Sequence, residues 1–380
     1  MEQISRLVTP LMTSNIGRNK VLLLYGARRV GKTHILRSIH QSGQYASRMM
    51  NGEDSKTADL LSERSVSNYV ELLGDTRLLL IDEAQVIPDI GKILKLMIDE
   101  FPELTIIASG SSSFDLAYKG GEPLVGRSIT FQLFPVSQME LKPHEDLLQT
   151  RENLESRLLY GSYPEVVNQT KPKDKMAYLQ DLVEGYLLKD LLMFDAVKNA
   201  SKLKKLLVLL AYQVGNEVKY EELGTQLGMS RNTVERYLDL LTKVFIIHPL
   251  TAFSSNLRKE VTKPCKLYFN DNGLRNALIG EYKQLAIRQD VGQLWENYVF
   301  MERKKQNHYQ QLNKQLFFWR TYDGQEIDFI EKDRETGQML AFEAKWNPAA
   351  KHRMPNYFKT NYPHVEVEIV HAQNYLNFVC

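Results

Sequence analysis

A glycine-rich stretch near the amino terminus combines residue types that hold a phosphate. In "VLLLYGARRVGKTHIL", an apolar run leads into Gly26-x-x-x-x-Gly31-Lys32-Thr33 and then into a helical pattern. Glycines allow backbone angles at which successive N–H groups surround a β-phosphate, while the lysine neutralises phosphate oxygens and the Thr33 hydroxyl binds Mg²⁺. The order of strand, loop and helix therefore predicts a P-loop. The expected nucleotide contacts are Gly26, Ala27, Arg28, Arg29, Val30, Gly31, Lys32, Thr33 and His34.

Two acids end a second apolar stretch, "TRLLLIDEAQ". At the end of a strand that follows a P-loop, Asp82 is expected to hold Mg²⁺ through water and Glu83 to polarise the attacking water. The alternative is that both acids only start the next helix, although they come directly at the strand end. A glutamate beside the Mg²⁺ ligand predicts that the nucleotide is hydrolysed as well as bound.

Two later segments contain further polar groups that could reach the phosphates. Ser109 and Ser111 follow a third apolar strand, "LTIIASGSSS", where they are either sensors of the γ-phosphate or ordinary turn residues. Arg127, in "LVGRSITF", precedes the next strand. It could stabilise transition-state charge in cis, or act as an arginine finger in the neighbouring subunit of a homo-oligomer. A surface arginine without a catalytic role fits the same pattern.

A third group of charged residues lies near the carboxyl terminus. "AFEAKW" places Glu343 and Lys345 two residues apart in an apolar strand, and Asp328 lies on the strand before it. Two carboxylates can hold Mg²⁺ or Mn²⁺ against a phosphate while a lysine positions or deprotonates water. The preceding helix supplies a further acid, Glu296 or alternatively Glu302. The other interpretation is a buried ion-pair network without catalytic activity.

One helix and a three-stranded antiparallel sheet are needed to position these C-terminal acids. The helix is expected over "VGQLWENYVFMERKKQ" and the strands over "LFFWRT", "EIDFIEKD" and "QMLAFEAKW". Asp-Gly and Thr-Gly pairs between the strands predict hairpin turns. Glu343 and Lys345 then point to the same face of the last strand. Asp271, in "LYFNDNGL", is predicted to cap a helix.

The segment "KYEELGTQLGMSRNTVERYLDLLTKVFII" has the layout of a helix-turn-helix. One helix is expected to end near Gly228, and Ser230 can cap the next. The spacing predicts a buried face made of Val234, Tyr237, Leu238 and Leu241. The opposite face presents Arg231, Asn232, Arg236 and Lys243, interrupted by Glu235 and Asp239. A winged-helix domain is therefore predicted, with either DNA or protein as the partner of its exposed face.

Length and composition limit the class of protein. A chain of 380 residues is expected to form two to three domains. Its 48 basic and 46 acidic residues nearly cancel, so any surface for nucleic acid must be local. Cys265 and Cys380 are the only cysteines, which excludes a disulfide framework and a Cys-based zinc site. The chain opens without a secretory signal and has no apolar run near the roughly 18 residues of a membrane helix, so a cytoplasmic protein is predicted.

Four domains are predicted along the chain. They are an ATPase domain at residues 1–142, a helical lid or linker at 143–200, a winged-helix-like domain at 201–254 and a nuclease-like domain at 255–380. The prolines at 135 and 143 and the charged stretch after them mark the change from sheet to helices.

Several segments together resemble prokaryotic AAA-superfamily ATPases of the group whose C-terminal half is a domain of unknown function. The similar segments are "LYGARRVGKTHIL", "LLLIDEAQ", "ASGSSSFDL", "LVGRSITFQLFPVSQMEL" and "LLYGSYPEVV". This resemblance implies an α/β fold with a doubly wound parallel sheet and the extra strand of the glutamate-using ATPases. It also implies that the nucleotide is ATP and binds at the C-terminal edge of that sheet.

The C-terminal acids resemble the PD-(D/E)xK nuclease superfamily through Glu296, Asp328, Glu343 and Lys345, although Ile327 stands where that motif has proline. This resemblance implies a restriction-endonuclease-like α/β domain in which the three acids bind metal and the lysine acts on water. The expected function is Mg-dependent ATP binding and hydrolysis coupled to a DNA-binding or nuclease-like domain. The alternative is an ATP-switched regulatory module whose nuclease-like domain is inactive.

Overall fold

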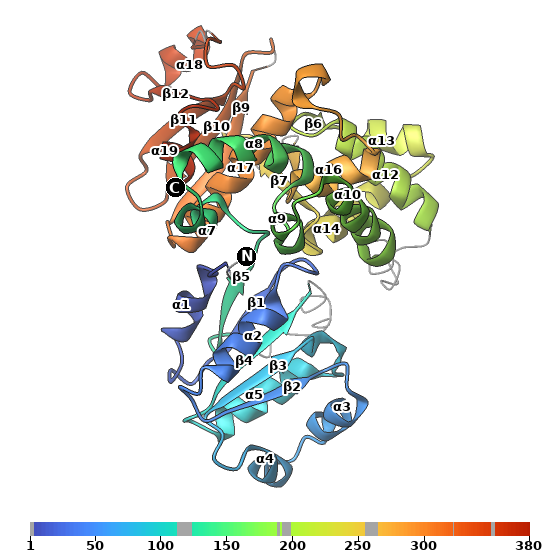
Figure 1. The fold of residues 1–380 in the computed structure, drawn as a ribbon, viewed down its shortest axis with the longest axis vertical. Coiled ribbons are helices and arrows are strands. Elements are labelled where there is room, and N and C mark those ends of the chain that lie inside the picture. Colours follow the sequence, from blue (N-terminus) through green and yellow to red (C-terminus); the bar gives the residue numbers. More distant parts are fainter. Residues whose placement is uncertain are drawn as a thin grey trace. The chain divides into compact units, whose positions relative to one another are not determined.

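The computed structural model describes residues 4–111, 124–187, 191, 199–254, 265–321, 323–350 and 354–380. The chain forms two compact units (Figure 1). One contains Ser5–Phe134 with Lys243–Phe245, and the other contains Pro135–Thr242 with Ile246–Cys380. The predicted boundary between residues 254 and 255 adjoins a stretch outside the described residues, and the four predicted domain ranges remain predictions.

The first unit is built on a parallel sheet of five strands. Its strands are β1 (Val21–Tyr25), β2 (Ser47–Asn51), β3 (Leu78–Asp82), β4 (Thr105–Gly110) and β5 (Ser128–Gln132). Their order is β2-β3-β4-β1-β5, and all neighbours run parallel. β4 therefore lies between the strand that leads into the glycine-rich loop and the strand that ends in Asp82. This confirms the predicted parallel sheet with its extra strand.

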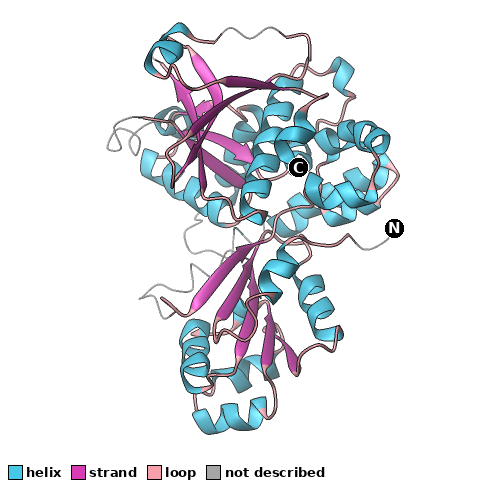
Figure 2. Cartoon of the chain, turned by 90° about the vertical axis from the view of Figure 1, so that its left-hand side faces the viewer, coloured by secondary structure: helices cyan, strands magenta, loops and turns pink. Residues whose placement is uncertain are grey.

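Helices cover both faces of this sheet (Figure 2). They are α1 (Val8–Thr13), α2 (Lys32–Gln41), α3 (Ser55–Ser62), α4 (Val66–Leu73) and α5 (Ile90–Glu100), with a short 3₁₀ turn at Ala84–Val86. Every residue of β1 and β3 is buried, as expected for strands that alternate between two covered faces. Leu79 and Ile81 on one face pack in a cluster with Ile93 and Leu94 of α5.

The second unit begins with helices. They are α7 (Gln138–Leu141), α8 (Leu147–Tyr160), α9 (Pro164–Asn168), α10 (Pro172–Asp181), α12 (Ala200–Tyr212) and α16 (Asn272–Ile279), with short 3₁₀ helices at Lys142–His144 and Leu285–Ile287 and a π-helix at Leu182–Leu187. Asp146 and Gln149 form a capping box at the start of α8, which fixes where that helix begins. Asp271 caps α16 by accepting a hydrogen bond from the Leu274 N–H at 3.1 Å, which confirms its predicted role.

A helix-turn-helix and a small sheet follow α12. The elements are β6 (Glu217–Val218), α13 (Tyr220–Leu227), α14 (Arg231–Lys243), β7 (Ile247–Thr251) and β8 (Cys265–Phe269), and the sheet order is β6-β8-β7 with antiparallel neighbours. Gly228 ends α13 at a φ of +59°, and the Ser230 hydroxyl accepts from the Thr233 N–H at 3.2 Å. The predicted face of Val234, Tyr237, Leu238 and Leu241 is buried. The local pattern was therefore predicted correctly.

The last part of the second unit is a helix followed by a four-stranded sheet. The elements are α17 (Val291–Tyr309), β9 (Lys314–Arg320), β10 (Glu326–Asp333), β11 (Met339–Ala344), α18 (Asn356–Asn361), β12 (Val367–Val370) and α19 (Tyr375–Val379). The order is β12-β11-β10-β9. β9, β10 and β11 are antiparallel, as predicted, and β12 adds parallel to β11.

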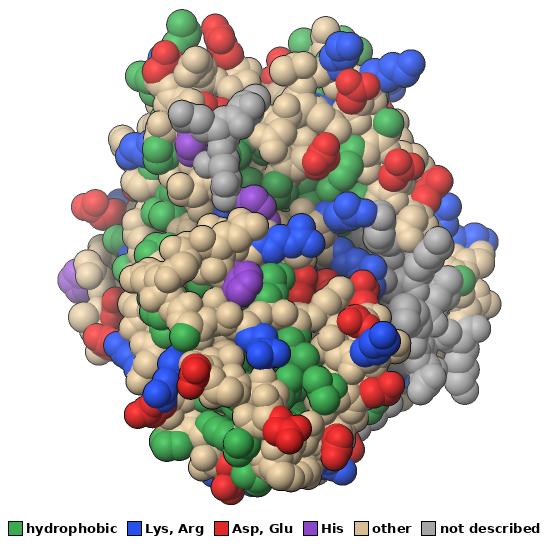
Figure 3. Space-filling view, turned by 60° about the horizontal axis from the view of Figure 1, so that its bottom comes forward, with side chains coloured by type: hydrophobic (Ala, Val, Ile, Leu, Met, Phe, Trp, Pro, Cys, Tyr) green, Lys and Arg blue, Asp and Glu red, His purple; other side chains and the backbone are tan. Residues whose placement is uncertain are grey.

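On the face drawn in Figure 3, Lys and Arg side chains lie interspersed with Asp and Glu side chains. This mixture agrees with the near balance of 48 basic and 46 acidic residues. Across the described ranges, no helix has both the length and the apolar character needed to cross a membrane.

Candidate functional site

The glycine-rich loop joins β1 to α2 and curls around a buried ammonium group. Gly31 precedes α2 with a φ of +105°, a left-handed conformation that favours glycine. Lys32 opens the helix, and its Nζ donates to the carbonyl oxygens of Gly26 (2.9 Å) and Ala27 (3.0 Å). A Cβ at position 26 would lie 2.3 Å from the Leu133 carbonyl oxygen, so only glycine fits there. The loop thus has the P-loop geometry that its sequence predicts.

An arginine from the segment before the sheet holds this loop in place. The Arg6 guanidinium donates to the carbonyl oxygens of Val30 and Phe134, both at 2.6 Å. Arg6 is buried, so these bonds are shielded from water. Sequence reasoning missed this residue, because one arginine outside the motif gives no signal of the loop it contacts.

One serine hydroxyl joins the two acids at the end of β3. Ser109, on β4, donates to Oδ1 of Asp82 and accepts from the Glu83 N–H at 3.2 Å. Asp82 and Ser109 are both buried. A hydroxyl can donate once and still accept, so Ser109 satisfies the carboxylate and the backbone together. Ser109 therefore contacts the carboxylate of Asp82 and the backbone of Glu83, while its role as a γ-phosphate sensor stays a prediction.

Glu83 itself lies in an unusual backbone conformation. Its φ is +48°, a region that non-glycine residues rarely adopt and one often found at functional sites. The Gln85 amide donates to the Glu83 carboxylate at 2.5 Å. Ser111 lies 3.4 Å from the same amide nitrogen, so it faces Gln85. The sequence identified the glutamate, but it gave no indication of its glutamine partner.

Arg127 lies at the opposite edge of the sheet from the glycine-rich loop. It directly precedes β5, and its carbonyl accepts from the N–H of Val21, the first residue of β1. The loop follows the other end of β1, at Tyr25. The exposed guanidinium pairs with Asp99 at 2.5 Å. Arg127 and the glycine-rich loop therefore lie at opposite ends of β1, which disfavours action in cis; a catalytic role of Arg127, in cis or in a neighbouring subunit, stays a prediction.

The donor groups at the carboxyl edge suit a nucleotide and Mg²⁺. Magnesium prefers oxygen ligands and is usually held by one or two protein groups together with phosphates and water. Thr33, in the first turn of α2, offers a hydroxyl, and Asp82 keeps one carboxylate oxygen beyond the one bound to Ser109. Within the described ranges, no three His, Cys, Asp or Glu side chains gather to hold a metal. The ligands here would accordingly be Thr33, Asp82 and the nucleotide.

The three charged residues singled out near the carboxyl terminus meet in one pocket. Lys345 Nζ lies 2.7 Å from Glu343 Oε2 and 3.7 Å from Asp328 Oδ2, and the Ala344 N–H donates to the same Asp328 oxygen at 2.9 Å. The pocket has a volume of about 600 Å³. We call it the acidic pocket; its lining is Gln325, Glu326, Asp328, Glu343, Lys345, Met354, Pro355 and Asn356.

A bulge in β10 sets the direction of Asp328. The pairing of β10 with β9 shifts between Ile327 and Ile330, so β10 has one residue more than β9 over this stretch. Such bulges re-aim a side chain and are common beside active sites. Regular alternation along "EIDFIEKD" gave no sign of this irregularity.

Burial and close charges alter the proton affinity of the pocket's groups. Burial, followed by repulsion from Asp328, raises the pKa of Glu343 to about 8, although Lys345 opposes the shift. Burial alone would lower the pKa of Lys345, but Asp328 and Glu343 attract its charge and raise it. Charge in this pocket is therefore balanced internally.

Glu296, on α17, extends this charged group, while Glu302 does not. The Tyr268 hydroxyl donates to Glu296 at 2.7 Å, and Lys266 Nζ lies 3.2 Å from it. Burial raises the pKa of Glu296 to about 7, with repulsion from Asp328 adding to the shift and attraction to Lys266 opposing it. Glu302 instead pairs with Lys305 at 2.6 Å. The structure thus favours Glu296 over Glu302 as the helix acid. Among the described residues no three acids gather closely enough to hold a metal, so the metal site predicted from Glu296, Asp328 and Glu343 together is not assembled in the structure.

Two basic residues of α14 lie on its exposed side. Arg231 pairs with Glu221 of α13 at 2.9 Å, and both side chains are exposed. The Arg236 guanidinium lies 5.9 Å from the centre of the Tyr237 ring. The exposed side of α14 therefore has the basic groups that its sequence predicted, with Glu235 and Asp239 also exposed among them.

Comparison with protein families agrees with the geometry of the nucleotide site. A family model described as an AAA domain matches residues 18–142. Residues 18–142 form an AAA domain. The match includes the P-loop, the strand ending in Asp82 with Glu83 directly after it, Ser109 on β4 and Ser111 just after that strand. Two domains of unknown function, DUF8612 at residues 151–285 and DUF4143 at residues 291–376, account for most of the rest.

One solved structure and several curated proteins are similar to this chain. The Walker-type ATPase PABY2304 of Pyrococcus abyssi superposes with a TM-score of 0.52 at 15% identity, covering 73% of this chain and 96% of that one, which shows a shared fold. An uncharacterized protein of Mycobacterium tuberculosis is 28% identical over 334 residues, 86% of this chain and 70% of that protein. One from Methanocaldococcus jannaschii is 24% identical over 333 residues, 82% and 72% respectively.

The acidic pocket and the residues that contact Glu296 beside it come from different domains of unknown function. Asp328, Glu343 and Lys345 lie within the 291–376 match, whereas Lys266 and Tyr268 lie within the 151–285 match. Lys266 also forms an ion pair with Glu326. Sequence reasoning missed these partners, since a lysine and a tyrosine in the buried strand "CKLYF" resemble ordinary strand residues.

Proposed function

We propose that this protein is a Mg-dependent ATPase whose hydrolysis in the AAA domain controls a second unit that binds DNA. The observation that carries the ATPase proposal is the shared contact of Ser109 with the Asp82 carboxylate and the Glu83 backbone. It fixes the predicted metal-holding acid and the predicted catalytic acid relative to each other. Proper relative placement of such groups is what phosphoryl transfer chiefly requires from a protein.

Each polar group of the site has a distinct chemical role in this proposal. Lys32 and the N–H groups at the start of α2 bind phosphate oxygens. Thr33 and Asp82 hold Mg²⁺, which when bound neutralises charge on the β and γ oxygens. Glu83 orients the attacking water and takes up its proton.

Measurement of phosphate release from ATP tests this proposal. Glu83→Gln should retain ATP while turnover falls about 100- to 10,000-fold, the usual contribution of a positioned base. Glu53→Gln, an exposed acid of the same unit, is the matched control and should leave turnover unchanged. Normal turnover in Glu83→Gln would remove this residue from the catalytic role, and failure of both variants would indicate general damage to the fold.

DNA binding is assigned to the helix-turn-helix, which we propose is a winged helix. The order α12, β6, α13, α14, β7, β8 and the pairing of both outer strands with β8 support this. Lys and Arg side chains on such a face bind DNA phosphates, so binding of the protein to DNA should weaken as the salt concentration rises. Arg231→Glu with Arg236→Glu should abolish retention on DNA. Lys204→Glu with Lys205→Glu makes the same change of charge on exposed residues of α12 and serves as control. Unchanged retention after the α14 substitutions would exclude this helix.

A second candidate function is cleavage of DNA at the acidic pocket. It is favoured by the convergence of Asp328, Glu343 and Lys345 on a pocket of about 600 Å³. Two carboxylates with a substrate phosphate suit Mg²⁺ or Mn²⁺, which when bound would polarise the phosphate. The ion pairs of Lys345 with both acids support the alternative, an ATP-switched regulatory module with an inactive pocket.

Incubation with supercoiled plasmid and single-stranded DNA separates these two functions. The reactions contain Mg²⁺ or Mn²⁺, with and without ATP, beside the Lys345→Ala variant. Cleavage that Lys345→Ala abolishes would identify the pocket as a nuclease site. DNA that stays intact in every reaction would favour the regulatory module.

A further inference from the structure

Two side chains of β8 hold Glu296, and one of them, Lys266, also pairs with Glu326 of the acidic pocket's lining. The Tyr268 hydroxyl donates to Glu296 at 2.7 Å, and Lys266 Nζ lies 3.2 Å from the same carboxylate oxygen. These residues are two apart on the strand, so they project from the same face. Both side chains are buried. The Glu296 carboxylate on α17 is therefore bound by β8, a strand outside the sheet that carries Asp328 and Glu343.

Lys266 joins several acids at once. It pairs with Glu296 and also with Glu326, which lines the pocket. Burial alone would lower the pKa of Lys266, but attraction to Glu296, Glu326 and Asp328 raises it. Its side chain is only 2% exposed, so water screens these charges little. One ammonium group thus keeps carboxylates of α17 and β10 close to one another.

The strand that supplies Lys266 is locked against α17 beside Glu296. Asn297, the next residue of α17, accepts from the Phe269 N–H at 2.7 Å and donates to the Phe269 carbonyl at 2.9 Å. The ring of Tyr268 stacks on that of Phe300 with centroids 4.2 Å apart. Paired backbone contacts and ring stacking leave β8 little freedom to shift along the helix.

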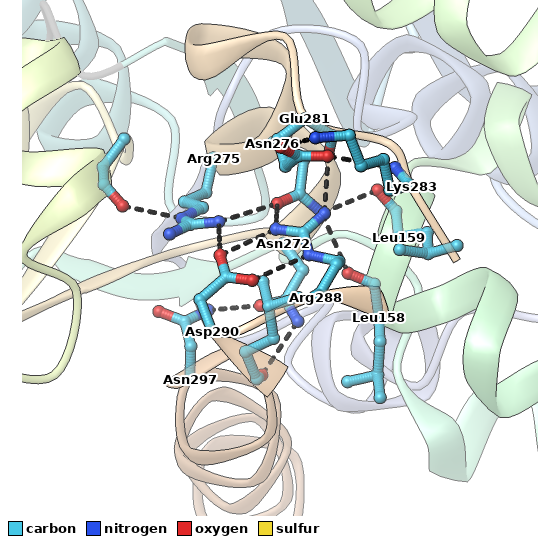
Figure 4. Close-up of polar contacts among 12 residues, drawn as sticks. Leu158, Leu159, Asn272, Arg275, Asn276, Glu281, Lys283, Arg288, Asp290 and Asn297 are labelled. Atoms are coloured by element: carbon cyan, nitrogen blue, oxygen red, sulfur yellow. Dashed lines mark hydrogen bonds and ion pairs between the residues drawn. The ribbon is translucent and has the colours of Figure 1, made fainter. Parts of the chain in front are cut away.

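The first turn of α17 is fixed by a buried polar network that comes before it in the chain (Figure 4). Asp290, which precedes α17, accepts from Arg275 of α16 at 2.5 Å and from Arg288 at 2.7 Å. Arg275 also donates to the Ala211 carbonyl at 2.7 Å. Figure 4 further shows Asn297 bound to Asn272 (2.6 Å). Contacts of Asp290 with Arg275 of α16 and with Arg288 therefore fix where α17 starts.

We infer that Lys266 and Tyr268 are positioning residues of the acidic pocket, which fix the Glu296 carboxylate next to Glu326 of the pocket lining, so that the pocket is complete only with β8 against α17. Only the metal-binding test of this inference rests on the proposed nuclease-like role. The test by the position of Glu296 does not depend on that role. The strand that supplies Lys266 and Tyr268 pairs with β7, the strand that follows α14 of the proposed DNA-binding helix-turn-helix.

Loss of Lys266 should free the Glu296 carboxylate from its place beside Glu326. Glu296 and Glu326 would lose their shared counter-charge while Asp328 still repels Glu296, so the Glu296 side chain should turn away. Partners that orient a metal ligand typically contribute about 10- to 100-fold to metal affinity. The opposite effect is expected if Lys266 only adds positive charge, because its removal would then make the pocket more attractive to a cation.

Binding of Mn²⁺ to the full chain distinguishes these outcomes. All variants contain Lys32→Ala and are measured without nucleotide, so the nucleotide site contributes little. Lys266→Met should weaken Mn²⁺ binding about 10- to 100-fold, Lys266→Arg should restore most of it, and Tyr268→Phe should weaken it less. Lys305→Met is the matched control, because Lys305 is an equally buried lysine that pairs with Glu302 and not with the pocket. It should leave Mn²⁺ binding unchanged.

Crystal structures of Lys266→Met and Lys266→Arg give a second readout that needs no metal. Glu296 displaced in the methionine variant and restored in the arginine variant supports the inference. Glu296 in its original place, or Mn²⁺ binding that is unchanged or tighter in Lys266→Met, overturns it. If the parent protein binds no Mn²⁺, the metal-dependent nuclease proposal fails, while the position of Glu296 still decides the role of Lys266. Cooperative thermal unfolding of each variant verifies that it is folded.

Discussion

The nucleotide site and the acidic pocket hold their charged groups in different ways. In the first, Lys32 donates to two neutral carbonyls and Asp82 accepts from a serine hydroxyl. In the second, Lys345 and Lys266 form ion pairs with Glu343 and Glu296. Neutral partners orient a charge without cancelling it, whereas an opposite charge cancels it. The serine hydroxyl thus leaves the charge of Asp82 in place for an incoming metal, whereas the acidic pocket must exchange internal partners before it can bind a charged ligand.

Removal of the P-loop lysine should show the largest effect on binding in this comparison. Lys32→Ala should weaken ATP binding about 10- to 100-fold, because a hydrogen bond to a charged group contributes about 1.5–3 kcal/mol. Titration with a fluorescent ATP analogue measures this. Lys92→Ala, an exposed lysine of the same unit, is the control. Equal affinity in Lys32→Ala and the parent protein would refute the P-loop assignment.

A smaller effect is expected from the serine that joins the two acids. Ser109→Ala removes a buried hydroxyl from the Asp82 carboxylate and from the Glu83 N–H, so both should lose their fixed orientation. Leaving such buried groups unpaired costs about 1–3 kcal/mol of stability. We expect ATP turnover to fall about tenfold, in line with about 1.4 kcal/mol of lost transition-state stabilisation. Ser109→Thr keeps the hydroxyl and should retain more activity; a Ser109→Ala variant as active as the parent would show that the contact is incidental.

Internal charge balance in the acidic pocket should appear as a dependence of stability on pH. The folded protein raises the pKa of Glu343 from 4.5 to about 8, so the folded state holds this proton more tightly than the unfolded state. Its contribution to stability is therefore full below about pH 4.5 and is lost as pH rises through about 8. In the presence of a chelator, Glu343→Gln should flatten the fall in melting temperature between pH 5 and 8.

The exposed glutamate Glu368 on β12 of the same sheet provides the control for that measurement. Glu368→Gln should leave the slope of melting temperature against pH as it is in the parent protein. If Glu343→Gln melts with the parent slope as well, the carboxyl is not protonated in the folded state and the pocket is less self-balanced than its contacts indicate.

The smallest effect is expected at Arg127, which lies far from the phosphates of its own chain. Arg127→Ala should leave ATP turnover unchanged in dilute protein, since it removes only an exposed ion pair with Asp99. If Arg127 acts on the nucleotide of a neighbouring subunit, Arg127→Ala should lower ATP turnover in the assembled oligomer. Mixing Arg127→Ala with Glu83→Gln subunits would then restore turnover, whereas turnover that scales linearly with concentration and shows no recovery argues against any catalytic role.

The sequence could predict the parts of both sites that depend on residues close together in the chain. The P-loop, the acids after β3 and the capped helix at Asp271 depend on neighbours within a few residues, so their geometry is written in local spacing. The meeting of Asp328, Glu343 and Lys345 was also predictable, because a hairpin brings consecutive strands together. The contacts of Arg6 with Val30 and of Lys266 with Glu296 join distant segments, and no local pattern encodes them. The bulge at Asp328 was missed for the same reason, since it depends on pairing with β9.

The alternation of β8 makes its register critical. Lys266 and Tyr268 contact Glu296, and Leu267 between them projects from the other side of the strand. Slipping a strand by one residue exchanges its two faces. A single-residue insertion or deletion that shifted β8 against β7 would present Leu267 to the glutamate and leave a buried lysine among apolar side chains. Length changes in the connection before β8 should therefore be tolerated only when they leave this strand in register.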